Sequence, residues 1–573
     1  MDSASLQLDA LRARPQGWLP FPARRLPVYR ADVLVVGSGV AGCCAALAAA
    51  GAGAHVMLVS KGRLEDTNTR YAQGGIAAAV GPEDRIEFHA GDTLRAGRGL
   101  ADPEVVETLV AEGPGAIEEL LAAGMEFDRR EDGAFDLGRE GGHRSARILH
   151  AQGTATGLEL QRTLGARLRS QASLDWYEHV MAVDLLRDAE GRIAGILALM
   201  GNDAHDPGMP VLIEAGATVL ATGGGGQIYR ETTNPQLATA DGLAMALRAG
   251  ARLRDLEFVQ FHPTILYLAG AARFLISEVV RGAGAVLRDR HGLAFMKDYH
   301  PDAELAPRDV VSRAIFRRMI ETGDTHVYLD LREVPAVGER FPELARITRE
   351  FGIDIRRDPI PVRPAVHYMI GGIEVDLDGR TSLPGLWATG ECASSGLHGA
   401  NRMGSNSLLE GLTHGPRTGR SAAGDARAVR RLLLPRPARG PLPRGVELSL
   451  TDMVYSLKSL MWRQVGIERD GEGLEDALRR IVPWEGYLAR LAPFSRAGVE
   501  VANMVQAGLL ITASALLRRE SRGAHYRRDH PELDPCWRCH TIAQADAGGV
   551  HLEAPLRDPE AVPGSSGSGE TGA

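Results

Sequence analysis

The sequence predicts an α/β fold of more than one domain, and three observations support this. The chain has 573 residues, whereas a single domain usually holds roughly 100–200. Residues 31–60 have the pattern strand, small-residue helix, strand, and there is no Asp, Glu, Lys or Arg from 33 to 60. Two later apolar runs, 216–225 and 383–392, are typical of buried strands that end in glycine-rich turns.

The remaining segments predict the order of the other elements. Residues 1–30 have the composition of an irregular extension, 61–100 are rich in loops, and 101–200 alternate helical patterns with short strands. Residues 246–355 carry strand and helix signals of their own, which predicts a separate domain. A Pro- and Arg-rich linker follows at about 433–445, then mostly amphipathic helix at 449–520, and a Gly/Ser-rich tail that we expect to be flexible.

Composition and charge exclude several classes of protein. A hydrophobic content of 44% is ordinary for a globular chain, and a net charge of −8 gives no electrostatic reason to expect a nucleic-acid partner. Five cysteines do not form a disulfide framework, and residues 1–30 lack the apolar core of a secretory signal. Glycines interrupt the uncharged stretch 33–60, which favours a buried unit over a membrane span. We therefore expect a cytoplasmic protein without a membrane partner.

The loop GSGVAG at 37–42 follows the first strand and opens the helix, which is the context of a dinucleotide-binding fingerprint. Gly37 makes the tight turn, Gly39 lets a pyrophosphate approach, and Gly42 packs the helix against the sheet. The second strand ends at Ser60 and Lys61, not at the acidic residue usual for NAD. This ending favours FAD, with the Ser60 hydroxyl as a candidate ribose contact.

Two further turns, ATGG at 221–224 and ATGE at 388–391, each end a strand. We expect both to close around one elongated cofactor. In the second turn, Glu391 is a candidate to accept a hydrogen bond from a ribityl or ribose hydroxyl; the alternative is a solvated turn carboxylate.

Several longer strings, in order, resemble the succinate dehydrogenase/fumarate reductase flavoprotein family. They are YAQGGIAA (71–78), REGGHRSARILHA (139–151), ATGGGGQIYRETTNP (221–235), ADGLAMALRAGA (240–251), EFVQFHPT (257–264), LISEVVRG (275–282), APRDVVSRAI (306–315), PAVHYMIGGI (364–373), ATGECASSGLHGANRMGSNSLLEGL (388–412) and ESRGAHYRRDHP (520–531). The resemblance implies a Rossmann-like FAD-binding domain (31–245 and 355–430) with an inserted α+β capping domain (246–354). A C-terminal helical domain (445–540) follows, with the N-terminal extension at 1–30 and a flexible tail at 541–573.

The resemblance also implies a set of FAD contacts. These are Gly37, Ser38, Gly39, Ala41, Gly42, Ser60, Lys61, Asn68, Thr69, Gln73, Gly74, Gly75, Asp241, Glu391, Ser407 and Leu408. Succinate dehydrogenase-type members carry a covalently flavinylated His just before the AQGG segment, where this chain has Asn68. We therefore expect the FAD to be bound non-covalently.

The family motifs bring together a candidate site for a dicarboxylate at His262, Arg308, His367 and Arg402. Arginine matches a carboxylate in bidentate geometry, and histidine donates a further hydrogen bond. Taken singly, His262 and His367 are more typical of structural residues, and Arg308 of a surface charge. Neutral donors and further contacts are expected from Gln260, Ser277 and Glu278.

Glu140 separates two branches of the family. A carboxylate in a site built for a dianion is repulsive unless the ligand also carries a cation, and aspartate has an ammonium where succinate has none. REGGH resembles the branch that oxidises L-aspartate, where this Glu faces the amine; the alternative is a loop carboxylate in a Gly-rich turn. By resemblance, Arg308 is also the proton donor to carbon when fumarate is reduced.

The first hypothesis is therefore oxidation of L-aspartate to iminoaspartate with oxygen or fumarate as acceptor. This would be the first step of NAD biosynthesis, with quinolinate synthase as downstream partner. The second is the flavoprotein subunit of a succinate dehydrogenase or fumarate reductase complex, and a third is a non-catalytic FAD-binding module. We expect no metal. The string CWRCH at 536–540 matches a haem-attachment pattern, but the family tail has Trp and His at these positions without haem, so we interpret it as structural.

Overall fold

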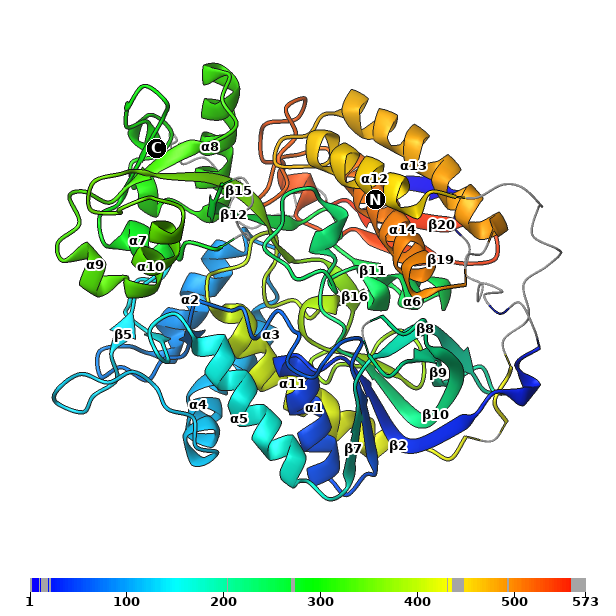
Figure 1. Cartoon of the computed structure of the whole chain (residues 1–573). Coiled ribbons are helices and arrows are strands. Elements are labelled where there is room, and N and C mark those ends of the chain that lie inside the picture. The colour runs from blue at the N-terminus through cyan, green and yellow to red at the C-terminus, as the bar shows by residue number, and fades with distance from the viewer. Residues whose placement is uncertain are drawn as a thin grey trace.

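The predicted βαβ unit lies in a seven-stranded sheet. The computed structural model describes residues 3–9, 11, 19, 22–203, 205–268, 274–429, 431–434, 448–491 and 494–557. The parallel strands are, in order, β7 (Leu174–Tyr177), β3 (Val56–Val59), β2 (Val28–Val36), β10 (Met209–Leu220) and β17 (Leu386–Ala388). On β10, the antiparallel pair β9 (Ile193–Met200) and β8 (Val180–Arg187) extends the sheet. The predicted α/β class is confirmed (Figure 1).

Two glycine-containing helices pack against each other and against this sheet. α1 (Val40–Gly51) follows β2, and α11 (Asn406–Asp425) crosses it closely. A side chain at Gly419 would come within 2.1 Å of the Ala45 carbonyl oxygen, so only glycine permits this approach. The packing fixes the start of α11 beside the start of α1. Nearby lie α2 (Ile86–Ala96), α3 (Pro103–Ala111), α4 (Gly113–Ala122), α5 (Thr156–Ser170) and the small sheet β4 (Ile76–Ala77), β6 (Ile148–Leu149), β5 (Leu137–Gly138).

The inserted segment has an antiparallel sheet of its own, with strand order β12-β15-β14-β13. The strands are β12 (Val259–Leu266), β15 (Ile360–Met369), β14 (Val327–Asp330) and β13 (Val286–Arg288), with helices α7 (Glu278–Gly282), α8 (Arg308–Thr322), α9 (Val337–Arg340) and α10 (Pro342–Glu350). β15 extends this sheet to residue 369, beyond the boundary expected at 354. A separate apolar core lies beneath these elements, between residues 266 and 362.

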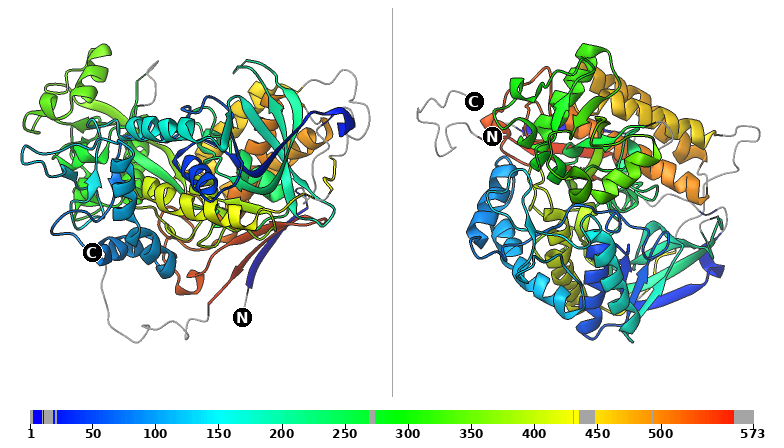
Figure 2. Two further views of the ribbon diagram at one scale, coloured as in Figure 1. Left: turned by 90° about the horizontal axis from the view of Figure 1, so that it is seen from below. Right: turned by 60° about the vertical axis from the view of Figure 1, so that its left-hand side comes forward.

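The two chain ends pair in a six-stranded sheet, with order β1-β20-β19-β11-β16-β18. Its strands are β1 (Ser3–Leu8), β20 (Val550–Pro555), β19 (Ile542–Ala545), β11 (Leu253–Arg254), β16 (Gly372–Glu374) and β18 (Ala393–Ser394). The expectations of an irregular extension and of a tail flexible from 541 are therefore wrong for 3–8 and 542–555 (Figure 2). Alternate residues of β20 are buried, and this period of two is the signal that the prediction overlooked. Residues 558–573 and most of the expected linker lie outside the described residues.

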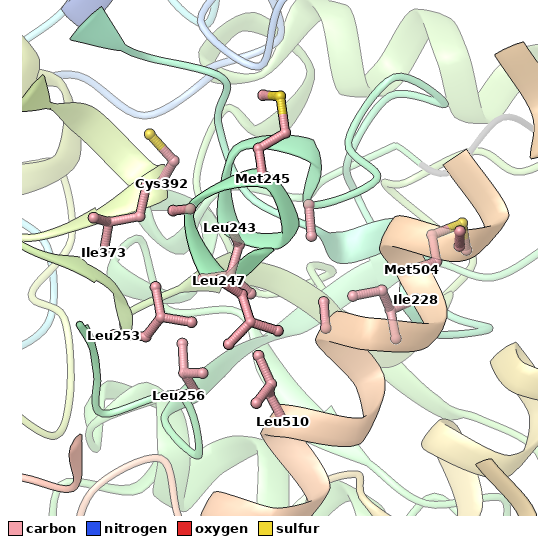
Figure 3. Close-up of a cluster of buried hydrophobic side chains, with 14 of the residues drawn as sticks. Ile228, Leu243, Met245, Leu247, Leu253, Leu256, Ile373, Cys392, Met504 and Leu510 are labelled. Atoms are coloured by element: carbon pink, nitrogen blue, oxygen red, sulfur yellow. The ribbon is translucent and has the colours of Figure 1, made fainter. Parts of the chain in front are cut away.

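The C-terminal helices are α12 (Leu450–Gln464), α13 (Gly471–Leu491) and α14 (Arg496–Leu517). α14 is long and apolar enough to cross a membrane by length and composition, but 89% of its apolar window is buried inside the protein. It packs on α6 (Asp241–Arg248), where Leu247 and Leu510 meet in one apolar cluster (Figure 3). α14 is therefore a mostly buried core helix, not the amphipathic helix expected there.

Candidate active site

The loop after β2 is shaped by close backbone approaches that require glycine. Gly37 has φ +113°, and a Cβ there would lie 2.1 Å from the Ala221 carbonyl oxygen; at Gly42 it would lie 1.9 Å from the Gly37 oxygen. Gly39 precedes the first turn of α1, where the Val40 N–H donates to Thr69 Oγ1 at 2.9 Å. The first backbone N–H groups of a helix favour an anion, so this cradle fits the pyrophosphate of a dinucleotide.

Lys61, at the end of β3, is held by two carboxylates from distant parts of the chain. Its Nζ lies 2.7 Å from Asp241 Oδ2 and 2.8 Å from Glu500 Oε1. Burial lowers the pKa of Lys61, but the two carboxylates outweigh burial and raise it. Sequence reasoning named Lys61 and Asp241 as FAD contacts but missed Glu500, because Glu500 lies on α14 and has no local motif.

Glu391 lies half-buried in the turn after β17. Its Oε1 accepts a hydrogen bond from the Met369 N–H and its Oε2 one from Asn68 Nδ2, both at 3.1 Å. Burial raises the pKa of Glu391 to about 7. Glu391 is thus bound by two protein donors, and its contact with a ribityl or ribose hydroxyl stays a prediction. Asn68, predicted to replace a flavinylated histidine, points its amide at this carboxylate.

Ser405 joins the predicted cofactor loop to the predicted substrate site. It precedes α11 with φ +62°, an uncommon conformation for a residue with a side chain. Its hydroxyl donates to Glu140 Oε2 at 3.0 Å and accepts from the Gly75 N–H at 3.2 Å. Sequence reasoning missed Ser405, although its place between Gly404 and Asn406 in the 388–412 string was a signal.

The remaining predicted cofactor residues surround the same loop. Ser38 and Ser60 place their hydroxyl oxygens 3.0 Å apart and are buried with Thr69. Ala41 and Leu408 are buried in the first turns of α1 and α11. Gln73 and Gly74 lie in the loop just before β4. The structure therefore brings Ser38, Ser60 and Thr69 together at the start of α1.

His262 and His367 face each other on neighbouring strands of the capping sheet. Their ring centroids are 5.4 Å apart, and β15 has a register shift where Gln260 pairs with Tyr368 and Phe261 with Val366, which leaves His367 as the extra residue of a bulge. Bulges often aim a side chain into a site. Burial lowers the pKa of both rings well below the usual range, and the charges of Arg308 and Arg402 lower it further.

Arg402 is buried in the loop before α11. Its Nε donates to Gln260 Oε1 at 3.2 Å and its Nη1 to Ser407 Oγ at 2.9 Å, while its guanidinium lies 4.7 Å from the Tyr368 ring centroid. Gln260 and Ser407, predicted as substrate and cofactor contacts, thus orient Arg402. Burial lowers the pKa of Arg402 to about 10, so it remains a cation at neutral pH.

Arg308 begins α8 and lies between two carboxylates. Its Nε donates to Glu278 Oε2 at 2.8 Å, and its Nη2 lies 3.7 Å from Glu140 Oε2. The Gly141 N–H donates to the other oxygen of Glu278. Burial raises the pKa of Glu278, but Arg308 and Arg281 outweigh burial and lower it to about 2. Glu278, predicted to contact substrate, is therefore an ionised partner of Arg308.

The charged side chains around Arg308 and Arg402 form a cluster with more cations than anions. Three buried arginines, Arg281, Arg308 and Arg402, lie with the two buried carboxylates of Glu140 and Glu278, and these five groups alone sum to one positive charge. Glu391, whose pKa is raised to about 7, also acts on Arg402. Arg281 was missed by sequence reasoning, although it lies in the LISEVVRG string. Both histidines are neutral in this environment. The arrangement thus suits a ligand with one net negative charge.

Two further predictions concern residues at the edge of the cluster and beyond it. Ser277 caps α7, with its Oγ accepting from the Val279 N–H at 3.4 Å.

In the CWRCH string, His540 Nδ1 lies 2.6 Å from Asp255 Oδ2, and burial raises the pKa of Cys539 to about 11. Among the described residues no group of three or more His, Cys, Asp or Glu is arranged to hold a metal.

The lowered pKa of His262 and His367 predicts an acid-sensitive fold. Unfolded histidines protonate near pH 6.5, so the unfolded chain binds more protons than the folded one below that pH. The thermal unfolding midpoint of the holoprotein should therefore fall as pH drops from 7 to 5. It should fall less in the double variant His262→Asn/His367→Asn, whereas His551→Asn, at an exposed histidine, should match wild type. If the unfolding midpoint falls equally with pH in all three proteins, the inference that His262 and His367 are neutral in the folded protein would be refuted.

Comparisons of the whole chain with known proteins agree on one family. Residues 32–408 match the family model described as FAD binding domain, and residues 455–563 match the one described as Fumarate reductase flavoprotein C-term. L-aspartate oxidase of Streptomyces coelicolor is 45% identical over 533 residues, covering 90% of this chain and 91% of that protein. L-aspartate oxidase of Mycobacterium tuberculosis is 43% identical over 512 residues, covering 88% and 94%.

Solved structures give the same result. The FrdA subunit of Escherichia coli quinol fumarate reductase superposes with a TM-score of 0.84 and 31% identity, covering 94% of this chain and 98% of that one. Mycobacterium smegmatis Sdh1 superposes with a TM-score of 0.78 and 33% identity, covering 94% and 96%. The chain therefore belongs to the succinate dehydrogenase/fumarate reductase flavoprotein family, and within it to the L-aspartate oxidases.

Proposed function

We propose that this protein uses FAD to oxidise L-aspartate to iminoaspartate. The observation that carries the proposal is Glu140, a buried carboxylate inside a cluster otherwise suited to anions. At neutral pH, L-aspartate has two carboxylates and one ammonium, so it carries one negative charge in excess, which complements the cluster. Succinate carries two negative charges and nothing that pairs with Glu140.

Each charged residue then interacts with one group of the substrate. Arg308 and Arg402 bind the carboxylates, with His262 and His367 as neutral donors. Glu140 pairs with the ammonium and takes its proton, after which the nitrogen lone pair forms the C=N bond as the Cα–H leaves as hydride. FAD, when bound, would supply the hydride acceptor, and oxygen (giving hydrogen peroxide) or fumarate would be the final oxidant.

Arg308 acts as a clamp in this half-reaction and not as a base. Burial lowers its pKa, but the charges of Glu278 and Glu140 outweigh burial and raise it. Arg308 therefore remains a cation, and it holds a substrate carboxylate while oxidation proceeds. In fumarate reduction its proton is available to a carbon atom.

The same proposal places the protein in metabolism. Oxidation of L-aspartate is the first step of de novo NAD biosynthesis, and iminoaspartate is consumed by quinolinate synthase, which we keep as the predicted functional partner. A cytoplasmic location and the absence of a membrane partner also remain predictions. The amide of Asn68 cannot form the bond that a histidine forms with flavin, which supports non-covalent FAD.

Anaerobic reduction of the holoprotein tests the proposal. L-aspartate should bleach the flavin absorbance, whereas succinate at the same concentration should leave it nearly unchanged. Release of flavin into the supernatant on acid precipitation should show that it is not covalently attached. Bleaching by succinate alone would favour the alternative, a subunit of a succinate dehydrogenase or fumarate reductase complex like those that share the fold. No bleaching by either ligand would favour a non-catalytic FAD-binding module.

Glu500→Gln should weaken FAD binding. The substitution removes one of the two carboxylates that hold Lys61 beside the predicted cofactor loop. We expect the dissociation constant of FAD to rise about tenfold, equivalent to about 1.4 kcal/mol, as measured by fluorescence titration of deflavinated protein. The control is Glu350→Gln, which removes an exposed ion pair with Arg346 on α10. An unchanged affinity in Glu500→Gln would rule out a contribution of Glu500 to the cofactor site.

A further inference from the structure

One face of α8 carries three charged residues at a spacing of four. Asp309, Arg313 and Arg317 therefore form a stripe along the helix, and Arg308 at the first position points from an adjacent face toward Glu278. The stripe contacts parts of the chain outside the capping segment. α8 is thus held by its own apolar core on one side and by polar contacts on the other.

Tyr526 receives both arginines of the stripe. The guanidinium carbons of Arg313 and Arg317 lie 4.9 and 5.2 Å from its ring centroid, and Arg317 Nη2 donates to its hydroxyl at 2.9 Å. Arg317 Nε also donates to Glu468 Oε1 at 2.5 Å. A cation over an aromatic face is attracted by the ring quadrupole, and two cations on one ring define its orientation to the helix.

The N-terminal end of the stripe contacts the loop that carries Arg402. Asn401 Nδ2 donates to Asp309 Oδ1 at 3.1 Å, and Asn401 Oδ1 accepts from Gln260, which in turn orients Arg402. The helix is also tied to β12, because Ser312 Oγ donates to the Phe261 carbonyl at 2.9 Å. A shift of α8 would therefore move Arg308 relative to Arg402.

Tyr526 belongs to a segment that is itself fixed by buried contacts. Its carbonyl accepts from the Arg469 N–H, and the neighbouring Arg527 Nη1 donates to the Ala515 carbonyl at the end of α14. The Ala524 N–H donates to the Ala400 carbonyl, two residues before Arg402. One segment thus anchors both the ring that receives α8 and the loop that presents Arg402.

We propose that Tyr526, assisted by Glu468, is a positioning residue that sets α8 so that Arg308 and Arg402 are spaced for one dicarboxylate. The inference rests on the proposed function, because it assigns both arginines to substrate. Neither Tyr526 nor Glu468 touches the substrate site, so they act through Arg308. Misplacement of a binding group by about 1 Å is enough to change activity by up to about a hundredfold.

Substitution of Tyr526 by Leu tests the proposal in the holoprotein. The probe is 2-methylaspartate, which lacks the Cα hydrogen and cannot be oxidised, and its binding is followed by the change in flavin absorbance. We expect Tyr526→Leu to raise the dissociation constant about tenfold, with Tyr526→Phe restoring most of the affinity because the ring remains. The matched control is Tyr487→Leu, which removes an exposed tyrosine stacked on Arg490 of α13 and should leave binding unchanged.

A double-mutant cycle separates positioning from general loss of structure. In an Arg308→Lys background, which keeps a cation beside Glu278 and Glu140, Tyr526→Leu should change probe affinity less than about twofold, because the guanidinium it positions is gone. An equal tenfold loss in both backgrounds would overturn the proposal. If Tyr526→Leu does not fold, Arg317→Gln, at a half-buried residue, takes its place in the same cycle. An equal loss of probe affinity in both backgrounds would again overturn the proposal. Failure of the wild-type protein to bind the probe would instead contradict the proposed function.

Discussion

The structure depends on a buried cation that has to be paired. Arg308 begins α8 inside the protein, and its two carboxylates come from separate segments: Glu278 from the start of α7 and Glu140 from the loop after β5. A buried charge without a partner is strongly destabilising, so the pairing fixes the capping sheet against the nucleotide-binding part of the chain. The proposed substrate site lies beside this pairing.

That constraint links the cofactor loop to the choice of substrate. Ser405 contacts the Gly75 N–H on one side and Glu140 on the other, so one hydroxyl orients both a predicted flavin contact and the carboxylate that would meet the amine. Close glycine packing of α11 on α1 holds Ser405 in place. The excess of one positive charge in the cluster then favours an amino dicarboxylate over a simple one.

Local signals predicted the fold class and the nucleotide loop, because the turn at Gly37 and the strands around it are set by neighbouring residues. The family strings brought His262, His367 and Arg402 to one site. The role of Glu278 was not predictable, since a carboxylate is equally able to meet substrate or an arginine until its neighbours are known. Glu500 was missed for the same reason: it meets Lys61 only through tertiary folding.

The termini show a different limit. Residues 3–8 and 542–555 are short alternating strands whose pairing partner lies at the other end of the chain. The period of two in 550–555 is a strand signal, but both segments are short and the polar neighbours on either side favour an irregular assignment. Pairing over such a separation becomes visible only in the structure.

The most direct test of the central claim compares two ligands that differ only in the ammonium. Both 2-methylaspartate and 2,2-dimethylsuccinate are dicarboxylates with a fully substituted C2, so neither can be oxidised at that carbon. Wild-type holoprotein should bind 2-methylaspartate at least about tenfold more tightly, and Glu140→Gln should remove that preference. Equal affinity for the two ligands in the wild-type protein, or a preference that survives Glu140→Gln, would contradict the role assigned to Glu140.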